Sequence, residues 1–173
     1  MKTGEYLENI LQSYKSTFDI IRPYQALDIF YSAYGYFYSH SEKYVMTKEV
    51  QLWETNSYEH IFFLERRHLL EEDLDAMDQL IHTYAEPVLV RKGESLPDKN
   101  HMYSYISFVF LSDETIDPLL IRRLKKYCYS KTYLFSLRGW CDVRIIAIDL
   151  AENNVYSNKK GARLKRVYKS LLK

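Results

Sequence analysis

The chain has 173 residues, a formal net charge of +1, 47% hydrophobic residues and 27% charged residues. These values fit one globular domain and exclude a disordered chain, a collagen, a coiled coil and a disulfide-stapled scaffold. The longest apolar runs, 106–111 and 145–148, fall far short of the roughly 20 residues that a membrane-spanning helix needs. The N-terminus has no signal-peptide pattern either, so we expect a single cytoplasmic domain over residues 1–173.

The first part of the chain predicts a helix followed by antiparallel strands. Apolar residues from Tyr6 to Phe18 recur every three or four positions, which predicts a helix that ends before Pro23. Alternating tyrosines between positions 34 and 38 then indicate a strand, with the three rings on one face of a sheet. The predicted strands are 34–38, 44–53 and 60–64, joined by polar turns at 39–42 and 54–57. Short polar turns between strands predict an N-terminal three-strand antiparallel meander.

The rest of the chain alternates between helical and strand patterns. We expect helices at 71–85, where Pro87 follows, and from Asp117-Pro118 onward, where an N-cap residue precedes a proline. Residues 102–111 are apolar on both faces, which indicates a central strand. Further strands are predicted at 133–137, 143–150 and 155–157, and a basic amphipathic helix within 159–173. The order predicts an α+β (mixed α/β) fold, with a single sheet of five to seven strands and about four helices.

Opposite charges are segregated along the sequence. Residues 1–117 contain 10 Lys/Arg and 20 Asp/Glu, a net charge of −10, whereas residues 118–173 contain 14 and 3, a net charge of +11. The basic residues form a cluster at 122–126 and another at 159–173. Two basic helices on one surface would bind nucleic acid or another anionic ligand. Alternatively, the acidic helix at 71–85 neutralises the basic one, or acidic and basic faces of two copies associate into a homo-oligomer.

The segment 138–144 places charged residues at the entrance of an apolar strand. Arg138 and Arg144 flank Trp140, which could form the wall of a pocket. The alternative is a structural ion pair between Asp142 and an arginine at the end of the sheet. The candidate binding residues are Arg122, Arg123, Lys126, Arg138, Trp140, Arg144, Lys160, Arg163 and Arg166.

No motif for a cofactor or a metal ion is present. The chain lacks a P-loop, a G-x-G-x-x-G fingerprint, a G-x-S-x-G elbow and any cysteine or histidine cluster with metal spacing. We expect the five histidines at turns or on the surface, and Cys128 and Cys141 as buried free thiols. The tyrosine-rich face of residues 34–38 could stack bases or sugars, but packing between sheet and helix is the more common role.

One family resemblance concerns the order of elements and one short motif. The third predicted strand ends in Leu64-Glu65-Arg66-Arg67, and Glu49 or Glu54 could supply a second carboxylate on the strand before it. Over residues 3–111 this arrangement resembles the core of PD-(D/E)xK nucleases. The resemblance implies Mg²⁺ held by Glu65 together with Glu54 or Glu49, although Arg67 stands where the family has a lysine, and arginine does not release its proton.

The two functional hypotheses therefore belong to different classes. The first is a non-enzymatic binding domain that uses a basic C-terminal surface and needs no cofactor. The second is a degenerate nuclease-like protein, which requires Glu65 to converge with Glu54 or Glu49 around a metal ion.

Overall fold

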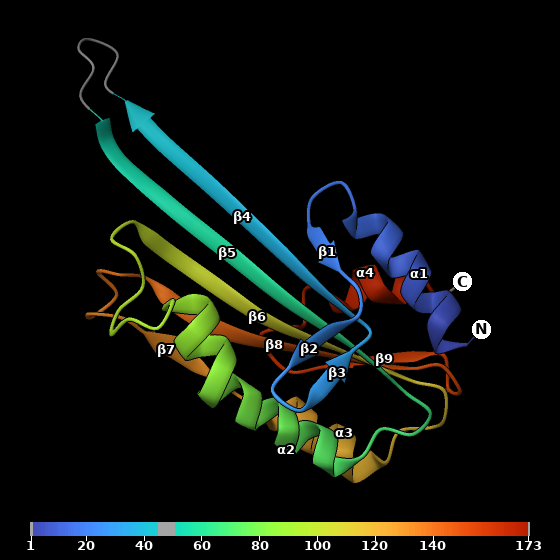
Figure 1. Cartoon of the computed structure of the whole chain (residues 1–173). Coiled ribbons are helices and arrows are strands. Elements are labelled where there is room, and N and C mark those ends of the chain that lie inside the picture. Colours follow the sequence, from blue (N-terminus) through green and yellow to red (C-terminus); the bar gives the residue numbers. More distant parts are fainter. Residues whose placement is uncertain (1, 45–50, 173) are drawn as a thin grey trace.

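A seven-stranded mixed sheet with helices on both faces forms the body of the computed structural model, which describes residues 2–44 and 51–172 (Figure 1). A separate two-stranded sheet consists of β2 and β3. The helices are α1 (Thr3–Tyr14), α2 (Glu71–Leu80), the π-helical segment η1 (Ile81–Val90), α3 (Pro118–Lys126) and α4 (Lys165–Ser170). The strands are β1 (Asp19–Ile21), β2 (Tyr24–Ala26), β3 (Ile29–Tyr31), β4 (Ala33–Tyr44), β5 (Gln51–Arg66), β6 (His101–Ser112), β7 (Ser130–Thr132), β8 (Trp140–Asp149) and β9 (Asn154–Ser157). The predicted α+β class is confirmed.

The centre of the sheet is parallel and its margins are antiparallel. The strand order is β1-β4-β5-β6-β8-β7, and β5, β6 and β8 run parallel to one another. On the far edge, β7 pairs with the first residues of β8 and β9 with its last residues. Residues 106–111 of β6 are all buried, as expected of a strand covered on both faces.

Alternating side chains of the central strands enter two separate cores. Phe62, Phe108 and Ile145 pack under α2, η1 and α3, whereas Phe63 and Val109 pack under α1 and α4 on the opposite face. Figure 1 shows α1 and α4 gathered over one end of the sheet, with the β4–β5 hairpin reaching well beyond them. The N-terminal halves of β6 and β8 consequently extend past the helices on the α1/α4 face.

Local sequence patterns correctly predicted the start of α3 and the position of the last strand, β9. The Asp117 carboxylate accepts a hydrogen bond of 2.6 Å from the Leu119 N–H, and Pro118 occupies the first helical turn. This is the predicted N-cap followed by proline. Strand β9 also lies where the sequence predicted one. No helix among the described residues is long and apolar enough to cross a membrane.

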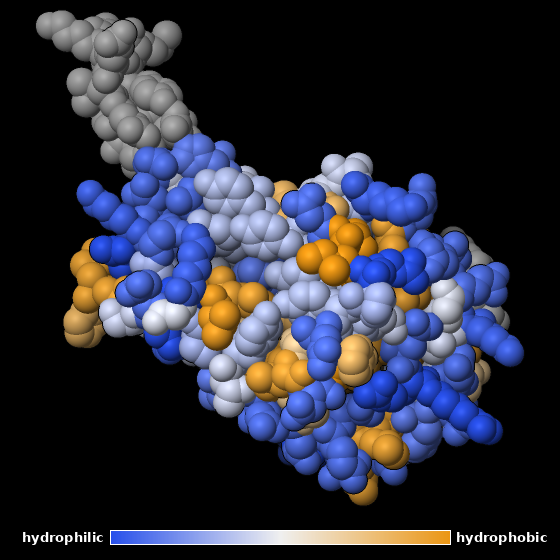
Figure 2. All heavy atoms as spheres, in the orientation of Figure 1, coloured by the Kyte–Doolittle hydropathy of each residue, from blue (hydrophilic) through white to orange (hydrophobic). Residues whose placement is uncertain are grey.

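A three-strand antiparallel arrangement is present, but it consists of different segments from those predicted. The polar runs 39–42 and 54–57 are not turns but lie inside β4 and β5, which form one long hairpin. Strand β1, rather than a third strand after the hairpin, supplies the other antiparallel strand by pairing with β4. Polar residues occur along this hairpin because much of it extends beyond the helices, so its side chains need not be apolar, and the surface over it is mostly hydrophilic (Figure 2).

Two further element predictions are wrong. Residues 133–137 form a turn instead of a strand, because Leu134, Phe135 and Ser136 all have positive φ angles. Pro87 does not end the second helix, which continues as η1 to Val90. The C-terminal helix, α4, covers only part of the predicted range.

Buried aromatic and histidine side chains fill the space between the sheet and α2. Tyr34, Tyr36 and Tyr38 share one face of β4 as predicted: Tyr34 is buried, whereas Tyr38 is 47% exposed. His60 and His101 are buried, so the expectation that all histidines lie at turns or on the surface is wrong. Packing against the sheet is therefore the main role of Tyr34.

Candidate functional site

Helix α3 directs its cations to two different environments. Leu120 and Leu124 are buried, which leaves the opposite side of the helix exposed. Arg123 turns toward α2, where it forms an ion pair with Asp75 and lies 3.7 Å from Glu71. The expected neutralisation by the acidic helix thus applies to Arg123.

The remaining α3 cations border a groove against β9. The ammonium group of Lys125 lies 5.3 Å from the centroid of the Tyr156 ring. The groove has a volume of about 600 Å³ and is lined by Pro118, Ile121, Arg122, Lys125, Lys126 and Tyr156. Among the described residues, no carboxylate lies within 4 Å of Arg122, Lys125 or Lys126.

Helix α4 brings the second basic cluster to the other side of the same edge strand. Helices α3 and α4 lie on opposite faces of the sheet, so the expectation that the two basic helices share one surface is wrong; they are connected by β9, which packs against both. We call the cations on the two sides of β9 the basic edge. It consists of Arg122, Lys125 and Lys126 with Lys159, Arg163, Lys165, Arg166 and Lys169. Within the described part of the chain, no carboxylate pairs with any of these eight residues.

Arg144 and Lys160, two other predicted binding residues, are held in ion pairs. Arg144 pairs with Glu59 of β5, and its Nε donates to the Ser107 hydroxyl at 3.0 Å. Lys160 contacts Asp142 at 2.8 Å. The expected pair between Asp142 and an arginine is therefore not formed, because each residue has a different partner.

Burial perturbs Arg144 without removing its charge at neutral pH. Removal from water lowers the pKa of Arg144 to about 10, and the neighbouring Tyr14 and Tyr168 oppose the change. The guanidinium carbon lies 4.0 Å from the centroid of the Tyr105 ring, within the range of a cation–π contact. Arg144 consequently supports this ring from within the sheet surface.

Three aromatic rings lie together on the α1/α4 side of the sheet, beyond the two helices. The Tyr103 ring centroid is 5.0 Å from that of Tyr105 and 5.8 Å from that of Trp140. We call these three residues the aromatic face. Burial, then Asp142 and Tyr103, raise the pKa of Tyr105, whereas the nearby cations Lys160 and Arg163 oppose that rise. The aromatic face borders the basic edge, because Lys160, next to Lys159 in the sequence, pairs with Asp142, which is opposite Tyr105 in the register of β6 and β8.

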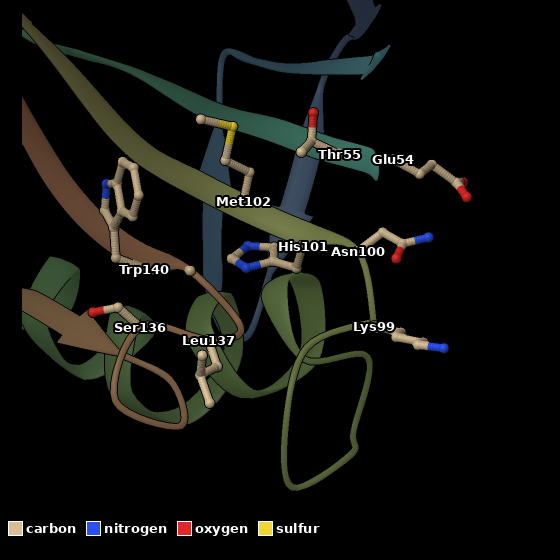
Figure 3. Close-up of a pocket in the computed structure, with 10 residues that line it drawn as sticks. Glu54, Thr55, Lys99, Asn100, His101, Met102, Ser136, Leu137 and Trp140 are labelled. Atoms are coloured by element: carbon tan, nitrogen blue, oxygen red, sulfur yellow. The ribbon is translucent and has the colours of Figure 1, made fainter. Parts of the chain in front are cut away.

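A pocket of about 210 Å³ opens at the start of the parallel strands, beside the aromatic face. Figure 3 shows Trp140, Met102 and Thr55 rising from the same side of β8, β6 and β5, respectively. Arg138 is not among the residues that line this pocket; its guanidinium donates a hydrogen bond of 3.1 Å to the carbonyl oxygen of Pro97, so it fastens two loops together. Trp140 thus lines a pocket, whereas Arg138 has a structural partner.

The carboxylates required by the nuclease resemblance do not converge. Glu54 and Glu65 stand near opposite ends of β5, which separates them by roughly 36 Å at about 3.3 Å per residue. One Mg²⁺ ion cannot bind both, so this pair does not fit the metal that the resemblance implies. Glu49 lies outside the described residues. Among residues 2–44 and 51–172, no three His, Cys, Asp or Glu side chains are grouped to hold a metal ion.

The two cysteines lie in different environments. Cys141 is buried, and burial, reinforced by Glu86 and Asp142, raises the pKa of its thiol far above the ordinary value. A thiol held in its protonated form is a poor nucleophile. The prediction of a buried thiol is wrong for Cys128, which is exposed.

Sequence reasoning did not single out Tyr103, Tyr105, Ser107 or Glu59 as site residues. Tyr103 and Tyr105 lie two positions apart on one face of the predicted strand 102–111, and this pair of aromatic residues is the signal that could have identified the site. Glu59 gave no such signal, because its contact with Arg144 joins residues far apart in the sequence.

A family model matches residues 2–170 of the chain. The chain belongs to the family described as "Domain of unknown function (DUF8052)". Both the basic edge and the aromatic face lie within the matched residues, so both are part of the DUF8052 domain. Comparison with curated proteins and with solved structures gives no match.

Proposed function

We propose that the chain is a binding domain for nucleic acid and that the basic edge contacts the phosphate backbone. The observation that carries this proposal is the contrast among its C-terminal cations. Arg123, Lys131, Arg144 and Lys160 each have a carboxylate partner within the fold. The eight cations of the basic edge have none among the described residues.

A group of cations without internal partners is suited to a polyanion. Nucleic acid carries a regular series of phosphates, and each lysine or arginine that neutralises one of them releases a condensed counterion. The basic edge extends over two helices and an intervening strand, so several phosphates of one strand can be bound at once. The overall charge of +1 means that the attraction is local rather than a property of the whole molecule.

Salt dependence of binding tests this proposal. Replacing Arg122, Lys125 and Lys126 together by serine should weaken binding of a 20-nucleotide oligonucleotide, measured by fluorescence anisotropy. If all three contact phosphates, the slope of log K against log[salt] should become shallower by about two to three units.

The matched control removes three exposed cations from elsewhere on the surface. Lys2, Lys15 and Arg67, also replaced by serine, change the net charge equally and should leave the slope unchanged. The proposal is wrong if the unaltered protein binds no oligonucleotide at about 50 mM salt, or if both triple variants lose the same affinity. Equal affinity for polyglutamate would indicate an acidic protein as the partner instead.

A further inference from the structure

We propose that the aromatic face stacks unpaired bases, so that the domain prefers single-stranded nucleic acid to a duplex. This inference rests on the proposed function and specifies its ligand. Tyr103 and Trp140 are directly paired in the register of β6 and β8, and Tyr105 follows two residues later on the same face. Flat rings on neighbouring strands of a sheet are the arrangement on which single-strand binders stack successive bases.

The aromatic face is accessible beside the pocket. Tyr103, Tyr105 and Trp140 are each partly exposed, because α1 and α4 cover only the other end of this face. Met102, in the same row, is 43% exposed. Trp140 and Met102 border the pocket together (Figure 3), so a base stacked on Trp140 has an apolar neighbour and space at its edge.

Polar groups beneath Tyr105 hold its ring in a fixed orientation before any ligand binds. The Ser107 hydroxyl donates to Glu59 at 3.2 Å and accepts from Arg144, whose guanidinium packs on Tyr105. These groups satisfy one another within the sheet surface. Binding therefore does not require Tyr105 to become ordered, which limits the entropic cost of stacking.

The cations beside the aromatic face indicate an anionic ligand, and the rings indicate a ligand with flat groups. Lys160 pairs with Asp142, which is directly opposite Tyr105 in the register of β6 and β8, and Lys160 follows Lys159 of the basic edge in the sequence. A single strand whose phosphates follow the basic edge can extend its bases across this border onto the rings. In a duplex the bases are already stacked inside the helix, so only the phosphate contacts remain.

The test compares a 20-nucleotide single strand with a 20-base-pair duplex of the same sequence at one salt concentration. The unaltered protein should bind the single strand at least about tenfold more tightly. Trp140→Leu should weaken single-strand binding about tenfold and change duplex binding less than twofold. Trp140→Phe, which keeps a stacking ring, should restore most of the lost affinity.

Two controls separate stacking from a change of fold or of surface hydrophobicity. Phe30→Leu removes a ring that is 64% exposed on β3 and should change neither affinity. If Trp140→Leu fails to fold, Tyr103→Leu tests the same prediction. In a Trp53→Phe background, the fluorescence of Trp140 should be quenched by the single strand and not by the duplex.

The outcomes distinguish the two proposals. Equal affinity of the unaltered protein for single strand and duplex, with loss of both in the basic-edge triple variant, would overturn base stacking and leave the proposed function standing. A Trp140→Leu variant that folds and binds the single strand normally would also overturn it. Failure of the unaltered protein to bind either nucleic acid would overturn both proposals.

Discussion

Among the five glycines, Gly139 is the one at which the fold can least accommodate an added side chain. It immediately precedes β8, has a φ of +70°, and a Cβ atom placed on it would lie 1.9 Å from the carbonyl oxygen of Met102. Such an approach is far inside van der Waals contact. This close contact with β6 depends on the tertiary structure, so the sequence around Gly139 does not indicate it.

Gly139→Ala should destabilise the protein more than a substitution at another left-handed glycine. Gly93 has a φ of +81° with nothing within 4 Å of an added Cβ, so Gly93→Ala should cost only the left-handed strain of about 1–2 kcal/mol. Gly139→Ala adds a backbone clash to that strain. Urea unfolding of both variants measures the difference, and equal losses would show that the loop moves away from Met102 at little cost.

His60 shows how burial controls the charge of a single side chain. Its Nδ1 lies 2.7 Å from the Tyr34 hydroxyl, while its Nε2 is buried without a hydrogen-bond partner in the described structure. Burial lowers the pKa of His60 to about 4. The folded protein therefore keeps this ring neutral at pH values where an unfolded histidine, with a pKa of about 6.5, is protonated.

Acid should consequently weaken the fold through His60. Between about pH 6.5 and pH 4 the unfolded chain binds more protons at this position, so the free energy of unfolding falls as pH falls, by at most about 1.4 kcal/mol per pH unit. In His60→Gln the loss of stability between pH 7 and pH 5 should be smaller by up to about 2 kcal/mol. Urea unfolding at both pH values tests this. The control is His82→Gln, which replaces an exposed histidine. If His60→Gln leaves the pH dependence of stability unchanged, the buried His60 is not the cause of the loss of stability in acid.

At the scale of elements, the sequence was informative where local chemistry determines structure. The N-cap of α3 at Asp117 and the two-sided apolar pattern of β6 depend on nearby residues, and both predictions are confirmed. The β4–β5 hairpin was misread because its uncovered length carries polar residues, which are also typical of turns. Composition alone does not distinguish a solvent-facing strand from a loop.

The candidate site was only partly predictable for the same reason. Charge clusters are visible in a sequence, so the cations of α3 and of the C-terminal segment were identified. Their arrangement around β9 depends on Asn158, a buried residue whose side chain bonds to β8 and to Gly161. The local pattern around Asn158 does not indicate its two bonds to β8, which join residues 13 and 15 positions apart in the chain.

At the scale of the whole molecule, segregated charge can also act between copies. The first 117 residues carry a net charge of −10 and the last 56 carry +11. The edge strands of the sheet are less suited to self-association than these opposite charges are. Strands β1, β7 and β9 are short. The part of β4 beyond Tyr36 pairs only with β5 in the described structure, and its sequence, Ser39-His40-Ser41-Glu42-Lys43, is polar.

We therefore expect weak self-association that salt suppresses. Sedimentation velocity should give a higher average mass at about 20 mM salt than at about 300 mM, because screening becomes effective within roughly 10 Å at 0.1 M. The triple serine variant of Arg122, Lys125 and Lys126 should remain monomeric at low salt, whereas the triple variant of Lys2, Lys15 and Arg67 should associate like the unaltered protein. An excess of single-stranded oligonucleotide should also dissociate the assemblies, because both ligands would occupy the basic edge. A mass that does not respond to salt would exclude this electrostatic association.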